Sequence, residues 1–128
     1  MDSAQSELIE LTRKLLHSIA HGDWETYAAL CDPNLTAFEP EARGQLVEGM
    51  AFHKFYFDIS SNRTPRHTTI VAPHVWLMGD SAVVSYVRLT QRIDDGGSPT
   101  TARFEETRVW QKQGGAWKHV HFHRSANE

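Results

Sequence analysis

Three arginines in the last third of the chain stand where a strand pattern calls for apolar side chains. Residues 81–124 read as three successive strands, and each strand carries one of them, Arg88, Arg108 or Arg124. Side chains on a strand alternate between its two faces, and the alternation places all three arginines on the apolar side. Burying a guanidinium group is costly unless it is paired. The pattern therefore predicts either a network of internal partners or a cavity that binds an anion.

Two interpretations of these arginines remain open at this point. In the first, they pair with glutamates and hold the sheet to the helices; the candidates are Glu106, Glu39, Glu41 and Glu105. In the second, their planar guanidinium groups bind a small carboxylate or a similar anion. Both hold if Glu106 and a bound anion share the arginines. The glutamates of the segment FEPEARG are assigned to a turn around Pro40.

Length and composition exclude several classes of protein. The chain has 128 residues, enough for one domain, and 40% of them are hydrophobic. A net charge of −3 without a basic run argues against a nucleic-acid binder. No apolar stretch is long enough to span a membrane, and the polar N-terminus is no signal peptide. With Cys31 as the single cysteine, a cytoplasmic protein without disulfides is predicted.

The first half of the chain predicts three helices. Residues 1–4 are expected to form a disordered tail. Apolar residues at three- and four-residue spacing predict a first helix with Ser6 as its N-cap, ending near Gly22. The second helix is expected over 24–31, before Asp32-Pro33, and the third over 50–58.

The second half predicts an antiparallel meander on which these helices pack. Before it, 35–38 and 45–49 are short extended pieces. Four longer strands are predicted, at 67–78, 81–93, 100–113 and 116–124. Pro73 marks a bulge or an edge position. The fold class is therefore α+β: helices packed in a strongly curved sheet, with a cone-shaped cavity on the concave side.

The opposite face of the sheet is predicted to make a protein–protein contact, because aromatic and polar groups mix there. On the last strand this face is expected to carry Trp117, His119, His121 and His123. Histidines at alternate positions can present imidazoles to zinc. Because no cysteine is nearby, no metal site is predicted.

Four segments of the sequence are specific enough to indicate a family. The runs CDPNLTAFEPEARGQLVEGMAFHKFYF, HTTIVAPHVWLMGD, EETRVW and HVHFHRS closely resemble the association (hub) domain of calcium/calmodulin-dependent protein kinase type II. The resemblance covers roughly residues 5–126 and implies one association domain over 5–128. It also implies a nuclear transport factor 2-like fold and no cofactor.

The resemblance further implies partners and a pocket. Proteins of this family form dimers that assemble into a double ring, commonly a dodecamer or tetradecamer, which gathers kinase subunits into one holoenzyme. A pocket in the family is lined by one tyrosine, one histidine and three arginines, and these positions match Tyr27, His53, Arg88, Arg108 and Arg124.

Two departures from the family stand out. The sequence shows no kinase domain and no calmodulin-binding segment ahead of the hub-like part, which is expected of an excised domain or of a free-standing hub-like protein. The loop at 58–66 looks shorter than the family's and lacks its tryptophan.

The predicted function is an oligomerisation scaffold with a cavity for a small carboxylate, and two alternatives stay open. One is an isomerase- or cyclase-type enzyme of the same fold, with Glu106 as its main acid and His53 as a base. A carboxylate clamped by arginine has a lowered pKa and is a poor base near neutral pH, which argues against it. The other is a carboxylate sensor in which the ligand biases oligomer size.

Overall fold

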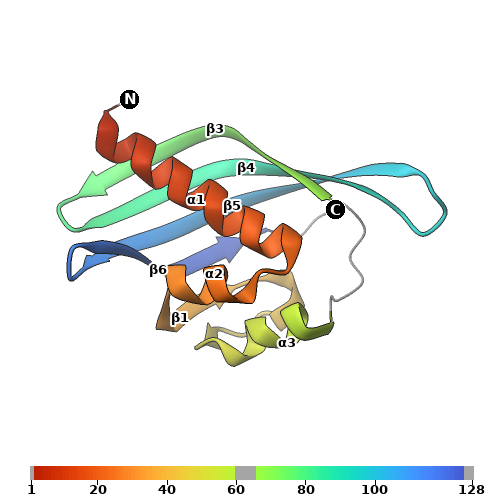
Figure 1. The fold of residues 1–128 in the computed structure, drawn as a ribbon, viewed down its shortest axis with the longest axis horizontal. Coiled ribbons are helices and arrows are strands. Elements are labelled where there is room, and N and C mark those ends of the chain that lie inside the picture. Colours follow the sequence, from red (N-terminus) through yellow and green to blue (C-terminus); the bar gives the residue numbers. More distant parts are fainter. Residues whose placement is uncertain (1, 60–65, 126–128) are drawn as a thin grey trace.

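The computed structural model describes residues 2–59 and 66–125. These described residues form three helices, one short 3-10 turn (η1) and six strands (Figure 1). Their bounds are α1 Ser3–His21, α2 Trp24–Leu30, β1 Cys31–Phe38, η1 Pro40–Ala42, β2 Val47–Glu48, α3 Ala51–Ile59, β3 Arg66–Met78, β4 Ser81–Ile93, β5 Pro99–Gln113 and β6 Ala116–Arg124. None of the described helices is long and apolar enough to cross a membrane. Most of the loop predicted at 58–66 lies outside the described residues.

Helix α1 begins earlier than predicted. Asp2, not Ser6, is its N-cap: Asp2 Oδ1 accepts a hydrogen bond from the Gln5 backbone N–H at 2.8 Å, and Gln5 Oε1 accepts one from the Asp2 N–H at 3.1 Å. This reciprocal capping box stabilises the first turn, so Ser3 and Ala4 belong to the helix and not to a tail. The predicted end is confirmed, because Gly22 forms a left-handed C-cap with φ 68°.

The sheet contains the predicted meander and two further strands, β1 and β2, which overlap the extended pieces predicted at 35–38 and 45–49. Its order is β2-β1-β6-β5-β4-β3, with β3 to β6 antiparallel as expected. Strand β1 starts at Cys31, which was predicted to end a helix, and lies parallel to β6, with Ala37 opposite Phe122. The register shifts between Cys31 and Thr36, where Pro33 has no N–H to give to a ladder.

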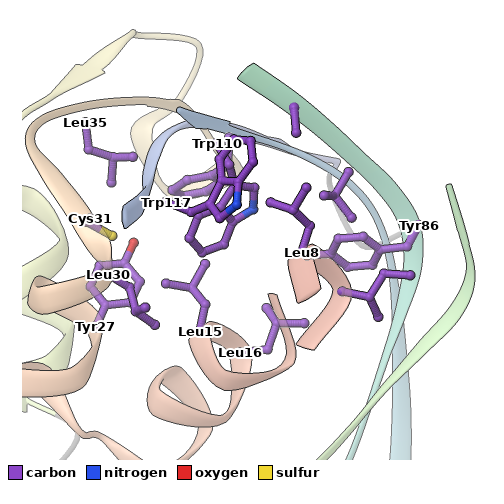
Figure 2. Packing of buried hydrophobic residues seen from close by; sticks show 14 of the residues in the cluster. Leu8, Leu15, Leu16, Tyr27, Leu30, Cys31, Leu35, Tyr86, Trp110 and Trp117 are labelled. Carbon is purple, nitrogen blue, oxygen red and sulfur yellow. The ribbon is translucent and has the colours of Figure 1, made fainter. Parts of the chain in front are cut away.

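The core lies between α1 and the sheet (Figures 1 and 2). Leu11 and Ile19 of the stripe predicted on α1 are only partly buried, whereas Leu8, Leu15 and Leu16 are buried as predicted. These three leucines point toward Trp110 on β5 and Trp117 on β6, which are buried as well. Figure 1 shows α1 lying across the sheet while α2 and α3 lie at one end of it. That end is where the predicted site residues gather.

A bulge in β6 overturns part of the predicted face assignment. The pairing of β6 with β5 shifts by one residue, so that Trp110 faces His119 and Val109 faces His121, which leaves Val120 as the extra residue. Trp117 and His119 are therefore buried on the inner face, whereas His123 is exposed. The predicted row of three histidines and one tryptophan on the outer face does not exist.

The edge strand β3 holds a strained alanine that gives a direct test of the fold. Its pairing with β4 is irregular between Val71 and His74, which confirms the bulge or edge position predicted for Pro73, and Ala72 adopts φ 51°. A left-handed backbone is unfavourable for alanine but not for glycine. We expect Ala72→Gly to raise the free energy of unfolding by about 0.5 kcal/mol. Urea denaturation measures it.

The matched control for this prediction is Ala102→Gly in β5. Ala102 pairs with Thr90 in a regular stretch of the sheet. Glycine there is expected to lower the free energy of unfolding by about 0.5–1 kcal/mol, because it loses more backbone entropy on folding. Equal losses of free energy of unfolding in the two variants would show that the backbone at Ala72 is not strained.

Candidate functional site

Five of the six predicted site residues line one cavity of about 110 Å³. They are Tyr27 from α2, His53 from α3, Arg88 from β4, Arg108 from β5 and Arg124 from β6. The lining also includes Ile19, Glu39, Glu41, Tyr56, Phe57 and Phe122. Glu106, the sixth predicted residue, is not among the described lining residues and lies behind the arginines. The cavity is therefore assembled from elements distant in the sequence, with arginine as its main polar component.

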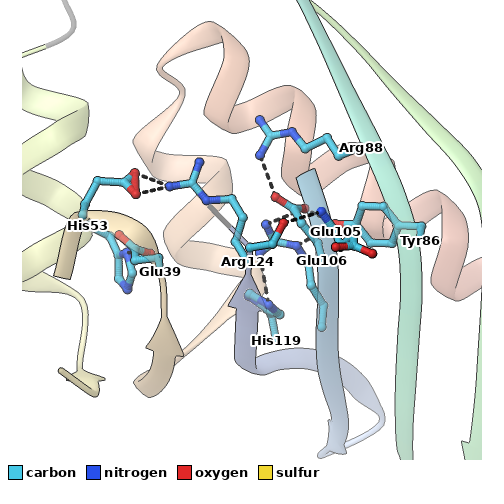
Figure 3. Close-up of polar contacts among 11 residues, drawn as sticks. Glu39, His53, Tyr86, Arg88, Glu105, Glu106, His119 and Arg124 are labelled. Carbon is cyan, nitrogen blue, oxygen red and sulfur yellow. Dashed lines mark hydrogen bonds and ion pairs between the residues drawn. The ribbon is translucent and has the colours of Figure 1, made fainter. Parts of the chain in front are cut away.

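Glu106 holds two of the arginines in place. Its Oε2 accepts a hydrogen bond from Arg88 Nη1 at 3.0 Å, and its Oε1 accepts one from Arg108 Nη2 at 3.1 Å (Figure 3). The Tyr86 hydroxyl donates to the same Oε1 at 2.5 Å. Burial alone would raise the pKa of Glu106, but Arg108, Arg88 and Tyr86 outweigh it and lower the pKa to about 2. Glu106 is thus a permanently charged, buried partner.

Arg108 is the most enclosed of the three arginines. Its Nε donates to the Tyr86 hydroxyl at 2.8 Å, and its guanidinium carbon lies 4.5 Å from the Phe122 ring centroid. On its other side, Arg108 Nη1 lies 3.4 Å from His119 Nε2, whose Nδ1 in turn lies 3.4 Å from the Cys31 sulfur. Burial lowers the pKa of His119 well below its usual range, so the imidazole is neutral beside the guanidinium.

Cys31, at the end of this chain of contacts, is buried and free. Burial raises the pKa of its thiol to about 12, partly offset by Arg108. A thiol with so high a pKa is not a nucleophile near neutral pH. The predicted structural role of Cys31 agrees with this environment.

Arg124 is less enclosed than the other two and forms an ion pair with Glu41. Its Nη2 donates to both carboxylate oxygens of Glu41, and its guanidinium carbon lies 4.9 Å from the Phe104 ring centroid. Side-chain exposure is 17% for Arg124 and 35% for Glu41. This ion pair therefore lies where the cavity meets solvent.

His53 and Glu39 face each other inside the cavity. His53 Nδ1 lies 3.7 Å from Glu39 Oε2, and both side chains are buried. Burial, followed by the charge of Arg108, lowers the pKa of His53 to about 4. Burial, followed by the charge of Glu41, raises the pKa of Glu39 to about 7, although Arg124 and Arg108 oppose this. Because His53 is neutral near pH 7, the contact is no ion pair there.

Aromatic rings close the apolar side of the cavity. Tyr27 is buried, with its ring centroid 5.1 Å from Phe57 and 6.2 Å from His53. Burial raises the pKa of the Tyr27 hydroxyl well above its usual range, so it is a neutral hydrogen-bonding group. The cavity thus combines cationic, neutral polar and aromatic walls, as sites for small organic anions do.

Two buried nitrogens of lining residues have no hydrogen-bond partner among the described residues. They are His53 Nε2 and Arg88 Nε. Buried polar groups are normally satisfied, so these atoms represent hydrogen-bonding capacity that the protein itself does not use. With Nδ1 directed at Glu39, Nε2 is the ring atom of His53 left for a further partner.

Sequence reasoning named Glu39 and Glu41 only as candidate partners of the arginines and did not include them among the residues of the cavity. Glu39 and Glu41 were assigned to a turn, and Pro40 does begin the 3-10 turn η1 between β1 and β2. The turn nevertheless places both carboxyl groups in the lining, because β1 runs alongside β6 and leads η1 to Arg124. Of the four glutamates named as candidate partners of the arginines, Glu106 and Glu41 form the ion pairs, and only Glu106 was predicted as a site residue.

Comparison with known proteins assigns the chain to a family. The family model "Calcium/calmodulin dependent protein kinase II association domain" matches residues 4–128. The delta subunit of calcium/calmodulin-dependent protein kinase type II from Oryctolagus cuniculus is 52% identical over 126 residues, which cover 96% of this chain and 24% of that protein. The chain thus spans about a quarter of the length of this curated relative.

Solved structures agree at the level of the fold. The calcium/calmodulin-dependent protein kinase II hub homology domain of Chlamydamonas reinhardtii matches with a TM-score of 0.92 and 47% identity, over 99% of this chain and 100% of that one. A nuclear transport factor 2-like superfamily protein from Salmonella enterica matches with a TM-score of 0.79 and 21% identity, over 97% and 91% of the chains. The predicted α+β, nuclear transport factor 2-like fold is confirmed. From the family match and these identities, the chain belongs to the calcium/calmodulin-dependent protein kinase II association domain family.

Proposed function

We propose that this chain is an oligomerisation scaffold that assembles into a closed ring of dimers, and that its arginine-lined cavity binds a small carboxylate. The observation that carries the first part is the association-domain match over residues 4–128. The surface supports it, because the edge strand β3 exposes Trp76 by 62% and Met78 by 55%. Exposed apolar groups along a sheet edge are typical of surfaces that contact another protein.

Light scattering coupled to size-exclusion chromatography tests the assembly. The protomer mass is 14.6 kDa. The expected particle is a ring of dimers, commonly a dodecamer or tetradecamer as in the resembled family. A monomer at micromolar concentration would contradict the scaffold function. Negative-stain images of the same fractions distinguish a ring from an open chain of dimers.

The cavity favours an anion because cationic groups outnumber ionised carboxylates. Arg88 and Arg108 share the single carboxylate of Glu106, and Arg124 pairs with Glu41. Glu39, with its pKa at about 7, is largely neutral in mildly acidic solution. A small carboxylate would bring the charge that this excess of guanidinium groups lacks, in the planar geometry that guanidinium binds.

The same geometry disfavours proton abstraction by Glu106 and His53, the acid and the base that the enzymatic alternative names. Glu106 is held at a pKa of about 2, and His53 at about 4. Neither group accepts a proton effectively near neutral pH, where a general base needs a matched pKa. Turnover of a small ketone or enol that is lost in Glu106→Gln would contradict this interpretation and support the enzymatic alternative.

Arg124→Gln tests the carboxylate site with little effect on the fold. Because this side chain is partly exposed, its removal leaves no buried charge unpaired. We expect the Kd for propionate to rise about tenfold, which corresponds to one charge-assisted hydrogen bond. Ligand-detected NMR titration of the full chain measures it. Arg92→Gln, at the exposed end of β4, is the matched control and should leave the Kd unchanged.

A further inference from the structure

Two glutamates form ion pairs with the cavity arginines, and Glu41 is the more exposed of the two and has fewer partners. Glu106 lies on the central strand β5, is 2% exposed, and is bound by Arg88, Arg108 and Tyr86. Glu41 lies on η1, at the solvent side of the cavity, and its one described ion-pair partner is Arg124. The Glu41 side chain is 35% exposed, so rotation of its bonds is enough to carry the carboxylate into water.

The position of Glu41 is also the position at which a ligand would arrive. Both Glu41 and Arg124 line the cavity, and they are its more exposed charged residues. Both oxygens of Glu41 accept from Nη2 of Arg124, so this edge of the guanidinium is already occupied by a carboxylate of the protein. A ligand carboxylate that binds Arg124 must therefore displace the carboxylate of Glu41.

We propose that Glu41 is an internal competitor at the carboxylate site: it occupies Arg124 in the free protein and is displaced when a small carboxylate binds. The inference rests on the proposed carboxylate binding and adds the residue that limits its affinity. Binding breaks the ion pair between Glu41 and Arg124 and forms one of the same kind between the ligand and Arg124. The affinity for the ligand is therefore low, even though three arginines line the site. The deeper network of Glu106 stays intact throughout.

Two expected results distinguish a glutamate that competes with the ligand from an ion pair that only closes the cavity. Removing the charge of Glu41 should strengthen binding of an anion, because Arg124 is then unoccupied and the repulsion between carboxylates is gone. It should leave binding of a neutral molecule of the same shape nearly unchanged, because an amide carries no charge for Glu41 to repel and accepts only a weaker hydrogen bond from the guanidinium. A residue that merely blocks access would hinder both molecules alike.

The experiment compares propionate with propionamide, the neutral isostere, by ligand-detected NMR titration at pH 7. The variants are Glu41→Gln and, as matched control, Glu48→Gln in β2. Glu48 is exposed and is not among the described residues that line the cavity. Thermal melting of each variant verifies folding, which Glu41→Gln should preserve because the ion pair it breaks is partly exposed.

Glu41→Gln is expected to lower the Kd for propionate about tenfold, the change that one charge-assisted hydrogen bond accounts for. Glu48→Gln should leave it unchanged, and propionamide binding should stay nearly unchanged in both variants. An unchanged or higher Kd in Glu41→Gln, with propionate bound by the unaltered protein, would overturn the competitor role and leave the carboxylate site standing. Absence of propionate binding in every variant would overturn the carboxylate site itself.

Discussion

Glu106→Ala is expected to destabilise the protein by about 3–5 kcal/mol, the range found when one partner of a buried ion pair is removed. The variant would leave Arg88 and Arg108 buried next to each other without their shared carboxylate. It would also remove the acceptor of the Tyr86 hydroxyl. Two like charges and an unsatisfied donor then remain in a region that water reaches poorly. Urea denaturation of the full chain measures the loss.

Glu105→Ala is the control that isolates this effect. Glu105 precedes Glu106 on β5 but points to the opposite, exposed face. The same change of charge there is expected to shift the free energy of unfolding by no more than about 0.5 kcal/mol. Both variants must be compared at equal protein concentration, because association adds to apparent stability. If the two variants lose similar amounts of free energy of unfolding, the Glu106 network contributes no more to stability than an exposed carboxylate does.

The contribution of Glu106 has a defined pH range. Its pKa in the folded protein is about 2, below the ordinary value of 4.5 for a glutamate. The folded state therefore binds fewer protons than the unfolded state between these values. Stability from Glu106 is complete above pH 4.5 and is lost as the pH falls toward 2.

The inner placement of the arginines could be predicted because it depends on local alternation alone. In β4 and β5 no bulge interrupts the sequence between Tyr86 and Arg88 or between Glu106 and Arg108, so period-two reasoning assigned the faces correctly. In β6 the extra residue Val120 reversed the assignment for everything before it. A bulge depends on how a strand fits its neighbour, and the alternation within a single strand does not reveal it.

Pairing between strands that are distant in the sequence was the second feature that the sequence alone did not predict. The parallel contact of β1 with β6 joins Ala37 to Phe122, and no turn between them specifies it. Without that contact, the segment after Phe38 could not be placed against Arg124. Glu39 and Glu41 were therefore assigned to a turn and named only as candidate partners of the arginines, although both line the cavity.

Glu39→Gln is expected to remove a loss of stability that the unaltered protein undergoes as the pH rises from 5 to 8. The pKa of Glu39 is about 7 in the fold, above the ordinary 4.5. The folded state therefore binds more protons than the unfolded state between these values, and stability falls as the pH rises through this interval. The groups that face Glu39 are His53 on α3, Glu41 on η1, Arg124 on β6, and Arg108 and Glu106 on β5.

The difference between the two proteins isolates Glu39 from these neighbours. His53, with its pKa at about 4, and Glu106, at about 2, titrate in both proteins, and their contributions cancel in the comparison. After allowance for solvent screening, Glu39→Gln should gain about 1.5 kcal/mol relative to the unaltered protein between pH 5 and pH 8. Urea denaturation at the two pH values, at one protein concentration, measures the gain. Glu25→Gln, on the exposed side of α2, removes a carboxylate outside the cavity and is the matched control, which should not reproduce this gain. If both variants behave alike, Glu39 ionises as an exposed glutamate does, and the cavity holds a full negative charge at that position near pH 7.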